Sequence, residues 1–368
     1  MPLNILIAPD KFKGTLTATA AANAIARGWR QARSADRLEL LPISDGGDGF
    51  GEALGRLLHA RPQTVRTVDA AHRQCTARWW WEPESKTAIL ESANVIGLAM
   101  LPPKQFHPFE LATFGLGAVL GAAVRKGAKR CLIGVGGSAT NDGGFGLARA
   151  LGWSFLDRDG EPIERWTGLQ SLDRIVAPRR GRGSPEVIAA VDVRNPLLGR
   201  RGAAQVYGPQ KGLRPREQIF ADACLRRLAT VFRKQFRRDL ARVPGAGAAG
   251  GLGFGLLAFL NARVQPGFEL FAGQARLDRR LRSADLVITG EGRIDASTFM
   301  GKGVGQLASL CKNGGVPCIA FGGTTDVPPK QKLFSEIHAL TEITTIEKAK
   351  KNAARYMAAL AKQVAENF

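Results

Sequence analysis

The chain has 368 residues, of which 45% are hydrophobic and 23% charged, a composition typical of a globular protein with two domains. No apolar stretch is long enough to span a membrane and the amino terminus lacks the features of a secretory signal, so we expect a cytoplasmic protein without a membrane partner. A net charge of +20 favours anionic ligands. The five cysteines form no C-x-x-C pair, which argues against zinc or a disulfide framework and favours buried free thiols.

Positive charge is concentrated in three segments. We interpret them as solvated basic faces, because no aromatic or motif context supports recognition of RNA or DNA. No specific nucleic-acid partner is therefore expected, although a basic surface that recruits nucleic acid is an open alternative. The segments contain Arg179, Arg180 and Arg182; Arg226, Arg227, Arg233, Lys234, Arg237 and Arg238 on one predicted helix; and Arg276, Arg279, Arg280 and Arg282.

The start of the chain follows the order strand, loop, helix twice. The apolar run at residues 3–8 predicts a buried parallel strand, and Thr17 is placed to cap the next helix. Small residues on that helix, including Gly28, predict close packing on a sheet. A second strand at 38–43 ends in S-D-G-G-D-G at 44–49, and a helix continues to Leu58. This order is typical of a doubly wound sheet.

The order of predicted elements changes after residue 65. Strands are expected at 64–68, 75–81 and 88–90 without helices between them, and alternation should place Trp80 opposite Trp79 and Trp81. A helix is expected from Phe109, then strands at 131–135 and 187–191, each followed by a polar loop. Residues 66–275 are therefore predicted to form a distinct mixed α/β domain.

Strand–helix alternation returns near the end of the chain. Strands are expected at 286–289, 317–321 and 337–340, followed by a last helix capped by Thr344. Residues 1–65 and 276–368 are thus predicted to form one domain with a five-stranded parallel sheet, which the second α/β domain interrupts. We expect the active site in the cleft between the two domains.

Polar or glycine-rich turns follow four strands of the first domain. In an open parallel sheet these turns meet at one edge, where ligands bind. They carry carboxylates together with Lys11, Lys13 and Arg293, a mixture that suits a magnesium-bound phosphate.

Two glycine-rich segments belong to the second domain. The loop G-V-G-G-S-A-T-N-D-G-G at 134–144 lies between a strand and a helix, where backbone N–H groups can bind phosphate. Ser138, Thr140 and Asn141 could contact phosphate oxygens or the substrate, and a tight structural turn is the alternative. The segment P-G-A-G-A-A-G-G at 244–251 is either a phosphate cradle or a close-packed helix entry.

Asp192 and Lys211 are candidate catalytic groups. Asp192 follows a predicted strand and could accept the proton of an attacking hydroxyl, whereas Lys211, in a rigid turn, could offset charge on a moving phosphoryl group. A helix cap and a surface lysine are the structural alternatives. The full predicted set is catalytic Asp192, Lys211, Lys11 and Arg293; cofactor-binding Gly136, Gly137, Ser138, Thr140, Asn141, Gly245, Gly247 and Gly250; substrate-binding Asp10, Lys13, Asn195 and Glu291; and metal-binding Asp45, Asp142 and Asp295.

In order along the chain, these segments resemble the bacterial glycerate kinase family. The segments that carry the resemblance include A-P-D-K-F-K-G at 8–14, the turns at 44–49 and 136–144, D-V-R-N-P-L at 192–197, G-P-Q-K-G at 208–212, the glycines at 244–251 and T-G-E-G-R-I-D at 289–295. The resemblance implies a flavodoxin-like domain interrupted by a second α/β domain, and transfer of the γ-phosphoryl group of ATP, with Mg²⁺, to D-glycerate. It favours 2-phosphoglycerate as the product.

The chain departs from the family pattern at a few positions. Ser44 stands in place of an alanine, and Asp48 in place of a glutamate. Ser297 stands where the family tends to have glutamine. Where the family tends to have Gly-Lys-x-Pro, this chain has Gly301, Lys302, Gly303 and Val304. These departures put a substrate role for position 297 in doubt. A kinase for a related hydroxy acid and a non-catalytic metabolite-binding regulator remain alternatives, and a homodimer is left open.

Overall fold

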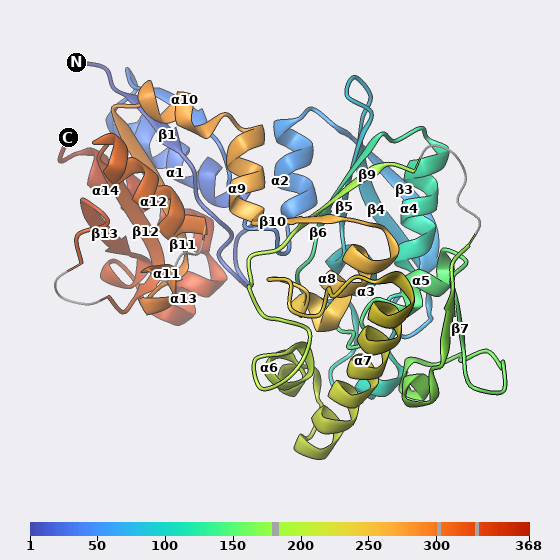
Figure 1. Cartoon of the computed structure of the whole chain (residues 1–368). Helices are drawn as coiled ribbons and strands as arrows, with labels where there is room; N and C mark the ends of the chain where they lie inside the picture. The colour runs from blue at the N-terminus through green and yellow to red at the C-terminus, as the bar shows by residue number, and fades with distance from the viewer. Residues whose placement is uncertain (179–183, 300–302, 328–330) are drawn as a thin grey trace. The chain divides into compact units, whose positions relative to one another are not determined.

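A computed structural model describes residues 1–178, 184–299, 303–327 and 331–368 (Figure 1). The arginine cluster predicted at 179–182, and Gly301 and Lys302, lie outside these residues. The chain folds into two compact units, one of Met1–Asp45 with Phe268–Phe368 and one of Gly46–Gly267. It passes between them twice, and both chain ends belong to the first unit. None of the helices within the described ranges has the length and apolar character needed to cross a membrane.

The first unit is built on a parallel sheet of five strands. They are β1 (Asn4–Ile7), β2 (Arg37–Leu40), β11 (Leu286–Ile294), β12 (Cys318–Thr325) and β13 (Glu336–Ala339). Their order is β13-β12-β11-β1-β2, and every neighbouring pair is parallel. Numbered within this unit alone, the order is that of flavodoxin-like sheets. The predicted fold class is therefore confirmed.

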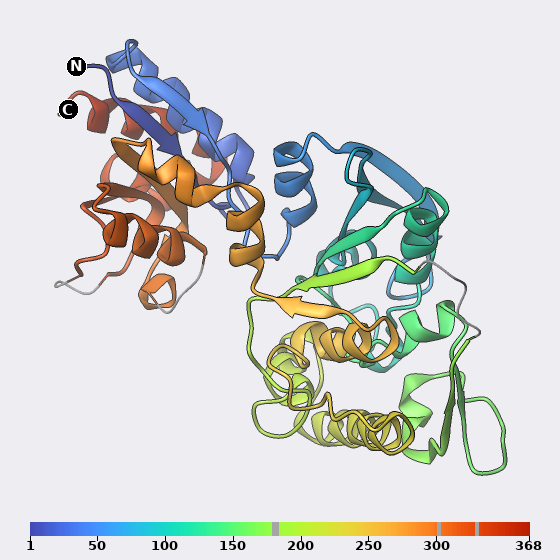
Figure 2. The same ribbon diagram turned by 45° about the horizontal axis from the view of Figure 1, so that its top comes forward.

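Helices cover this sheet. Ile5 and Ile7 share a core with helices α1 (Ala18–Ala32) and α14 (Ala353–Ala365) on one face of the sheet. Leu6, which lies between them, points to the other face by alternation. Helix α12 (Gly303–Gly314) contacts β11 and β12. Figure 2 shows these helices from a second direction. Thr17 caps α1 as predicted, its hydroxyl accepting the Ala20 N–H at 3.1 Å. Gly28, however, packs on a helix: an added Cβ would lie 2.0 Å from the Ala358 carbonyl oxygen of α14.

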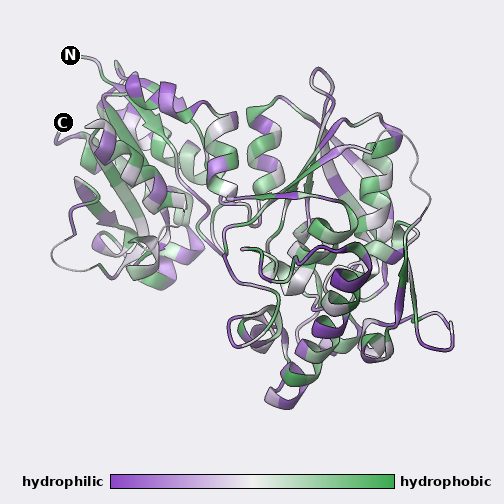
Figure 3. Ribbon diagram, viewed as in Figure 1, coloured by the Kyte–Doolittle hydropathy of each residue, from purple (hydrophilic) through white to green (hydrophobic). Residues whose placement is uncertain are grey.

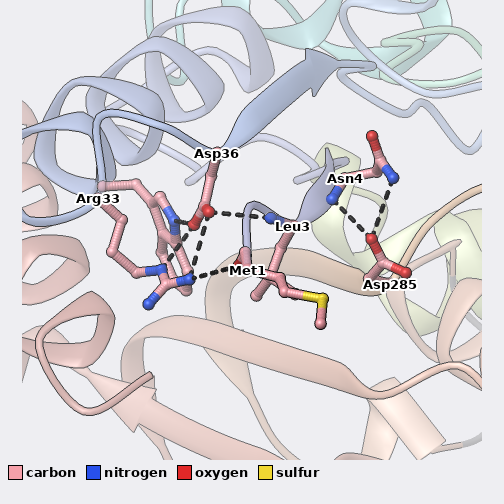
Figure 4. A network of polar contacts seen from close by, with 7 residues as sticks. Met1, Leu3, Asn4, Arg33, Asp36 and Asp285 are labelled. Carbon is pink, nitrogen blue, oxygen red and sulfur yellow. Dashed lines mark hydrogen bonds and ion pairs between the residues drawn. The ribbon is translucent and has the colours of Figure 1, made fainter.

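Two aspartates hold the start of β1 in the sheet (Figure 4). Asp36 accepts the Leu3 N–H at 2.9 Å, the Trp29 indole N–H at 2.9 Å and the Arg33 guanidinium at 2.7 Å. Asp285, just before β11, accepts the backbone and side-chain N–H groups of Asn4. Residues from both ends of the sequence thus fix the same strand.

The second unit contains a mixed six-stranded sheet of order β10-β9-β6-β5-β4-β3. Strands β5 (Thr87–Glu91), β6 (Arg130–Gly134), β9 (Glu186–Ala190) and β10 (Arg263–Gln265) are parallel, and β3 (Arg61–Val68) and β4 (Gln74–Glu82) add an antiparallel edge. Alternation along β4 is as predicted. Trp79 and Trp81 share a core with ring centroids 6.5 Å apart, and Trp80 packs on the opposite face.

The boundary between the units differs from the predicted one. Helix α2 (Phe50–Leu57), expected in the first domain, belongs to the second unit because added Cβ atoms at Gly51 and Gly55 would lie 2.0 and 2.6 Å from the Trp80 ring. The chain therefore crosses after Asp45 and again after Gly267, rather than at residues 65 and 275.

Four other elements differ from expectation. The helix expected from Phe109 begins at Leu116, after a short 3₁₀ turn at Pro108–Glu110. The last helix is two, α13 (Ile346–Lys351) and α14, with Thr345 as the cap of α13. Strands β11 and β12 continue through their glycines because they pair with each other as far as Ile294 and Thr325.

The remaining helices and a third, two-stranded sheet complete the two units. In helix α7 (Pro215–Phe236), Leu225 and Leu228 are buried whereas Arg226 and Arg233 are exposed, and Figure 3 shows both hydrophilic and hydrophobic residues along this helix. These elements are α3 (Ala93–Ile96), α4 (Leu116–Arg125), α5 (Phe145–Ala150), α6 (Ala203–Tyr207), α7 (Pro215–Phe236), α8 (Ala248–Phe259), α9 (Gly267–Gln274), α10 (Leu277–Arg282), α11 (Ala296–Phe299), the hairpin β7 (Ser154–Leu156) and β8 (Arg174–Val176), and 3₁₀ turns at Leu98–Met100, Trp166–Ser171, Pro209–Lys211 and Leu340–Glu342.

Candidate functional site

Three carboxylates gather at the carboxyl edge of the first unit's sheet. Asp10 follows β1, Asp45 follows β2, and Glu291 lies in the extension of β11, so they come from three adjacent strands. Burial, with the nearby charge of Asp45 and, less strongly, of Glu291, raises the pKa of Asp10 to about 7. This convergence is what the sequence predicted for the first domain, and it creates a site that a cation would stabilise.

Short polar contacts shape this edge. The Thr298 hydroxyl donates to Glu291 at 2.6 Å, and the Ser297 N–H and hydroxyl donate to one oxygen of Asp295 at 2.8 and 2.5 Å. Arg293 pairs with Asp295 at 3.4 Å and Asp326 at 3.0 Å, with 61% of its side chain exposed. Ser297, the departure from the family pattern, thus orients an acid of the first unit.

Lys11 and Lys13 flank the same edge. Lys11 is half-buried and its backbone N–H donates to Asp10 at 2.7 Å, whereas Lys13 is exposed, with its backbone beside Gly292. Gly303 lies near Asp45, where an added Cβ would be 3.5 Å from the Asp45 Cβ. Predicted site residues from both ends of the chain therefore share this edge.

In the second unit the glycine-rich loop follows β6 and leads into α5. An added Cβ at Gly136 would lie 2.7 Å from the Gly47 Cα, and one at Gly137 would lie 2.2 Å from Asp48 Oδ1. The turns at 46–49 and 136–137 are thus in close contact, and glycine is required there. Gly136 is half-buried and Gly137 exposed, and their backbone N–H groups have no hydrogen-bond acceptor among the residues described. Such donors can bind an anion.

Asp142 is saturated with hydrogen bonds. Its side chain is fully buried and accepts the backbone N–H and hydroxyl of Thr113, both at 2.8 Å, and the N–H groups of Gly144 at 3.1 Å and Gly146 at 2.9 Å. Burial raises the pKa of Asp142 despite these donors. Four protein donors favour a role in fixing the loop over the metal role that the sequence suggested.

Lys211 anchors the other side of this loop. Its ammonium Nζ donates to the Thr140 carbonyl oxygen at 2.6 Å, and the residue is only 7% exposed. Burial lowers the pKa of Lys211 to about 7, partly offset by the charge of Asp142. The surface-lysine alternative is therefore wrong, and the contact is to the loop backbone.

The second glycine segment packs against the first. Ala249, Gly250 and Gly251 have left-handed backbone conformations at the start of α8. An added Cβ at Gly250 would lie 1.9 Å from the Thr140 carbonyl oxygen, and Gly247 is similarly tight against Pro196 at 2.2 Å. Of the two readings from sequence, the close-packed helix entry explains these glycines.

Asp192 and Asn195 follow β9 but differ in their surroundings. Asp192 is exposed, with one oxygen accepting the Gly267 N–H at 2.9 Å. Asn195 donates to the Arg201 carbonyl at 2.8 Å and accepts the Tyr207 hydroxyl at 2.7 Å. Both polar atoms of Asn195 are therefore occupied by its own loop, which favours a structural role over the predicted substrate contact.

Sequence reasoning missed Glu91. This residue ends β5, is 6% exposed, and accepts the N–H groups of Gly49 at 2.8 Å and Gly51 at 2.9 Å. Its carboxylate therefore caps α2 and holds the 46–49 turn in the second unit. Its only signal in the sequence is an acid at the end of an apolar strand.

The acidic groups fit a partial cation site. No set of three or more His, Cys, Asp or Glu side chains within the described ranges has the arrangement of a complete metal site. Mg²⁺ bound to a nucleotide needs only one or two protein carboxylates, since phosphates and water fill the other positions. The acids beside Asp10 are compatible with that requirement.

Comparison with known proteins agrees with this arrangement. A sequence model of the glycerate kinase family matches residues 5–368. A glycerate kinase of Halalkalibacterium halodurans is 40% identical over 325 residues, covering 87% of this chain and 85% of the relative. The glycerate 2-kinase of Escherichia coli is 35% identical over 354 residues, covering 94% and 93%. A crystal structure from Salmonella typhimurium LT2, described as a candidate glycerate kinase 2, matches with a TM-score of 0.85 at 33% identity and covers 100% of this chain and 98% of that one.

The fold is α/β, with a flavodoxin-like unit and an inserted mixed unit, and the relatives place the chain in the kinase class of enzymes. The match extends over nearly the whole chain and over nearly the full length of these relatives. The chain belongs to the glycerate kinase family.

Proposed function

We propose that this chain transfers the γ-phosphoryl group of ATP to D-glycerate, forming 2-phosphoglycerate in the cytoplasm. The observation that carries the proposal is the convergence of Asp10, Asp45 and Glu291 at the carboxyl edge of the flavodoxin-like sheet. A cluster of carboxylates, in which the pKa of Asp10 is raised, favours a bound divalent cation, as phosphoryl transfer requires. The names of the relatives support glycerate as the acceptor.

Magnesium, when bound to the triphosphate, would neutralise charge and orient the phosphates. In this proposal Asp45, with Asp10 and Glu291 beside it, holds the cation, and Asp295 remains a predicted ligand. The backbone N–H groups of Gly136 and Gly137 bind phosphate oxygens, because they have no acceptor in the described part of the chain.

Asp192 accepts the proton of the attacking hydroxyl in this proposal. It is exposed at the end of β9, and its contact with Gly267 orients the carboxylate. Lys11, Lys13 and Arg293 supply positive charge beside the first unit's acids. Lys211, buried against the Thr140 carbonyl, acts as a positioning residue for the glycine loop.

The test is ATP consumption by the purified protein with a panel of small hydroxy acids. We expect turnover only with D-glycerate and Mg²⁺, and phosphorus NMR of the product should give the signal of 2-phosphoglycerate. Turnover with another hydroxy acid instead of D-glycerate would indicate a kinase of different substrate specificity. No turnover with any acid, combined with salt-dependent binding to random DNA, would instead support the regulator. Light scattering of the same sample would give the oligomeric state.

A further inference from the structure

Asn141 lies in the glycine loop between two residues that are each held in place. On one side, the Thr140 carbonyl oxygen accepts the Lys211 ammonium at 2.6 Å. On the other, Asp142 accepts both polar hydrogens of Thr113 at 2.8 Å. The backbone of Asn141 is therefore fixed from both directions, as in a preorganised binding residue.

Within the described residues, the carboxamide of Asn141 has no hydrogen-bond partner. Neither its Nδ2 nor its Oδ1 atom, both buried, has one within the residues that the structure describes, and the residue is 0% exposed. Leaving buried donors and acceptors unpaired is unfavourable, so a native protein keeps such a group for a reason, such as an ordered water or a ligand. Asn195, by contrast, uses both of its amide atoms within the protein.

The hydrogen-bonding groups of a carboxamide limit the class of ligand that it can bind. An amide presents donors at nitrogen and an acceptor at oxygen, side by side. A phosphate group offers only acceptors when ionised, so it would leave Oδ1 unpaired. A hydroxy acid offers both complements, because its hydroxyl can donate to Oδ1 while its carboxylate accepts from Nδ2.

The surroundings also favour a small acid. Lys211 donates to the adjacent Thr140 carbonyl oxygen, so its side chain lies close to the Asn141 backbone and, when protonated, adds positive charge there. Gly250 packs over the loop, since its added Cβ would lie 2.8 Å from the Asn141 Cα, so the space beside the backbone is narrow. Ala249, a non-glycine residue with φ of 52°, is strained in this covering segment, so the surrounding packing holds the segment in a specific conformation.

We propose that Asn141 is the residue that recognises the hydroxy-acid substrate, through a paired contact of its carboxamide with a hydroxyl and the carboxylate. This assigns Asn141 to the acceptor and not to the nucleotide, and it rests on the proposed function. An adenine edge carries a similar donor and acceptor pair, so the test must measure both substrates.

The experiment compares Asn141→Ala and Asn141→Asp with the wild type and with Asn261→Asp. Asn261 is exposed in the turn before β10, so its variant makes the same chemical change outside the site. We expect the KM for D-glycerate to rise about 10-fold or more in Asn141→Ala and further in Asn141→Asp, where a second carboxylate repels the substrate. The KM for ATP should stay within about twofold, as should both constants in Asn261→Asp.

A second arm measures direct binding of D-glycerate without nucleotide, by saturation-transfer NMR, on each variant after thermal melting has shown that it is folded. Loss of the NMR signal in the Asn141 variants supports the proposal even if turnover fails for other reasons, and an unfolded Asn141→Ala is replaced by Asn141→Ser. A rise in the KM for ATP alone overturns it in favour of nucleotide contact. Unchanged glycerate binding with a lower melting temperature overturns it in favour of an ordered water. A wild type that binds D-glycerate but transfers no phosphate would defeat only the proposed function.

Discussion

Asp192 Oδ1 accepts the backbone N–H of Gly267 at 2.9 Å. Its other oxygen lies beside Gly46, where an added Cβ would be 3.1 Å away. Gly46 and Gly267 are the residues at which the chain enters and leaves the second unit. One carboxylate, predicted from sequence as a proton acceptor, is therefore also in contact with both crossing segments.

This double contact gives a prediction for Asp192→Asn. The amide oxygen can still accept the Gly267 N–H, but the group can no longer take up a proton. We expect turnover to fall by about 10²–10⁴-fold with little change in melting temperature. Asp192→Ala, which loses the acceptor as well, should also melt earlier. Near-normal turnover in Asp192→Asn would remove Asp192 from the catalytic role and leave it as a structural contact.

Most of the fold could be predicted from the sequence because its signals are local. Apolar runs ending in polar turns gave the five parallel strands of the first unit, and alternation gave the packing of Trp80. The unit boundary could not be predicted, because it depends on Gly51 and Gly55 packing on that tryptophan from a distant strand. Such a contact leaves no local pattern in the sequence.

The candidate site was predictable in its residues but less so in their roles. The glycines at 136–144 were predicted to bind phosphate or to form a tight turn, and those at 244–251 to form a phosphate cradle or a close-packed helix entry. At Gly136 and Gly250, glycine is required because another backbone lies against it. Asp142 and Asn195 looked like ligands, and their partners inside the protein became visible only in three dimensions. The sequence motifs predict which residues belong to the site, whereas the hydrogen bonds in the structure show the role of each residue.

Lys211 should make stability depend on pH. Burial lowers its pKa in the folded protein to about 7, below the ordinary 10.5 expected in the unfolded chain. Between these values the unfolded chain binds a proton that the folded protein does not, so this group makes the free energy of unfolding rise with pH. The slope is at most about 1.4 kcal/mol per pH unit.

The measurement is urea unfolding of the wild type and Lys211→Met at pH 7, 8 and 9, followed by tryptophan fluorescence. Other titrating groups are common to both proteins, so the difference between them isolates Lys211. We expect the wild type to gain stability relative to the variant as pH rises. Parallel pH profiles would show that folding does not lower the pKa of Lys211, so that the lysine stays protonated in the folded protein.

Asp10 should respond to both pH and magnesium. Burial and the charges of Asp45 and Glu291 raise its pKa from 3.8 to about 7, so between these values the folded protein holds a proton that the unfolded chain has lost. Stability from this group is therefore lost as pH rises from about 4 to 7. Asp10→Asn should flatten that loss.

A bound cation stabilises ionised carboxylates, so it should offset the electrostatic repulsion among Asp10, Asp45 and Glu291. We therefore expect MgCl₂ at pH 7.5 to raise the melting temperature of the wild type more than that of Asp10→Asn. The control is Asp278→Asn, an acid on α10 whose side chain is 74% exposed. An equal magnesium effect in all three proteins would place the cation elsewhere.

The contact between the two glycine segments can be tested by three glycine-to-alanine changes. At Gly250 the new Cβ would meet the Thr140 carbonyl oxygen at 1.9 Å, and φ is +69°. Among the residues described, an added Cβ would have no neighbour within 4 Å at Gly14, which has a φ of +79°, or at Gly273 in α9, which has no positive φ. The three variants therefore separate steric clash from backbone strain.

We expect Gly250→Ala to lose about 3 kcal/mol or more of unfolding free energy, because clash and strain add. Gly14→Ala should lose about 1–2 kcal/mol from the left-handed backbone alone, and Gly273→Ala should gain up to about 1 kcal/mol because alanine favours the helix. Urea unfolding of each variant gives these values. If Gly250→Ala were no less stable than Gly14→Ala, the loop at Thr140 and the start of α8 could not be packed as described. The anchored position of Asn141 would then lose one of its supports.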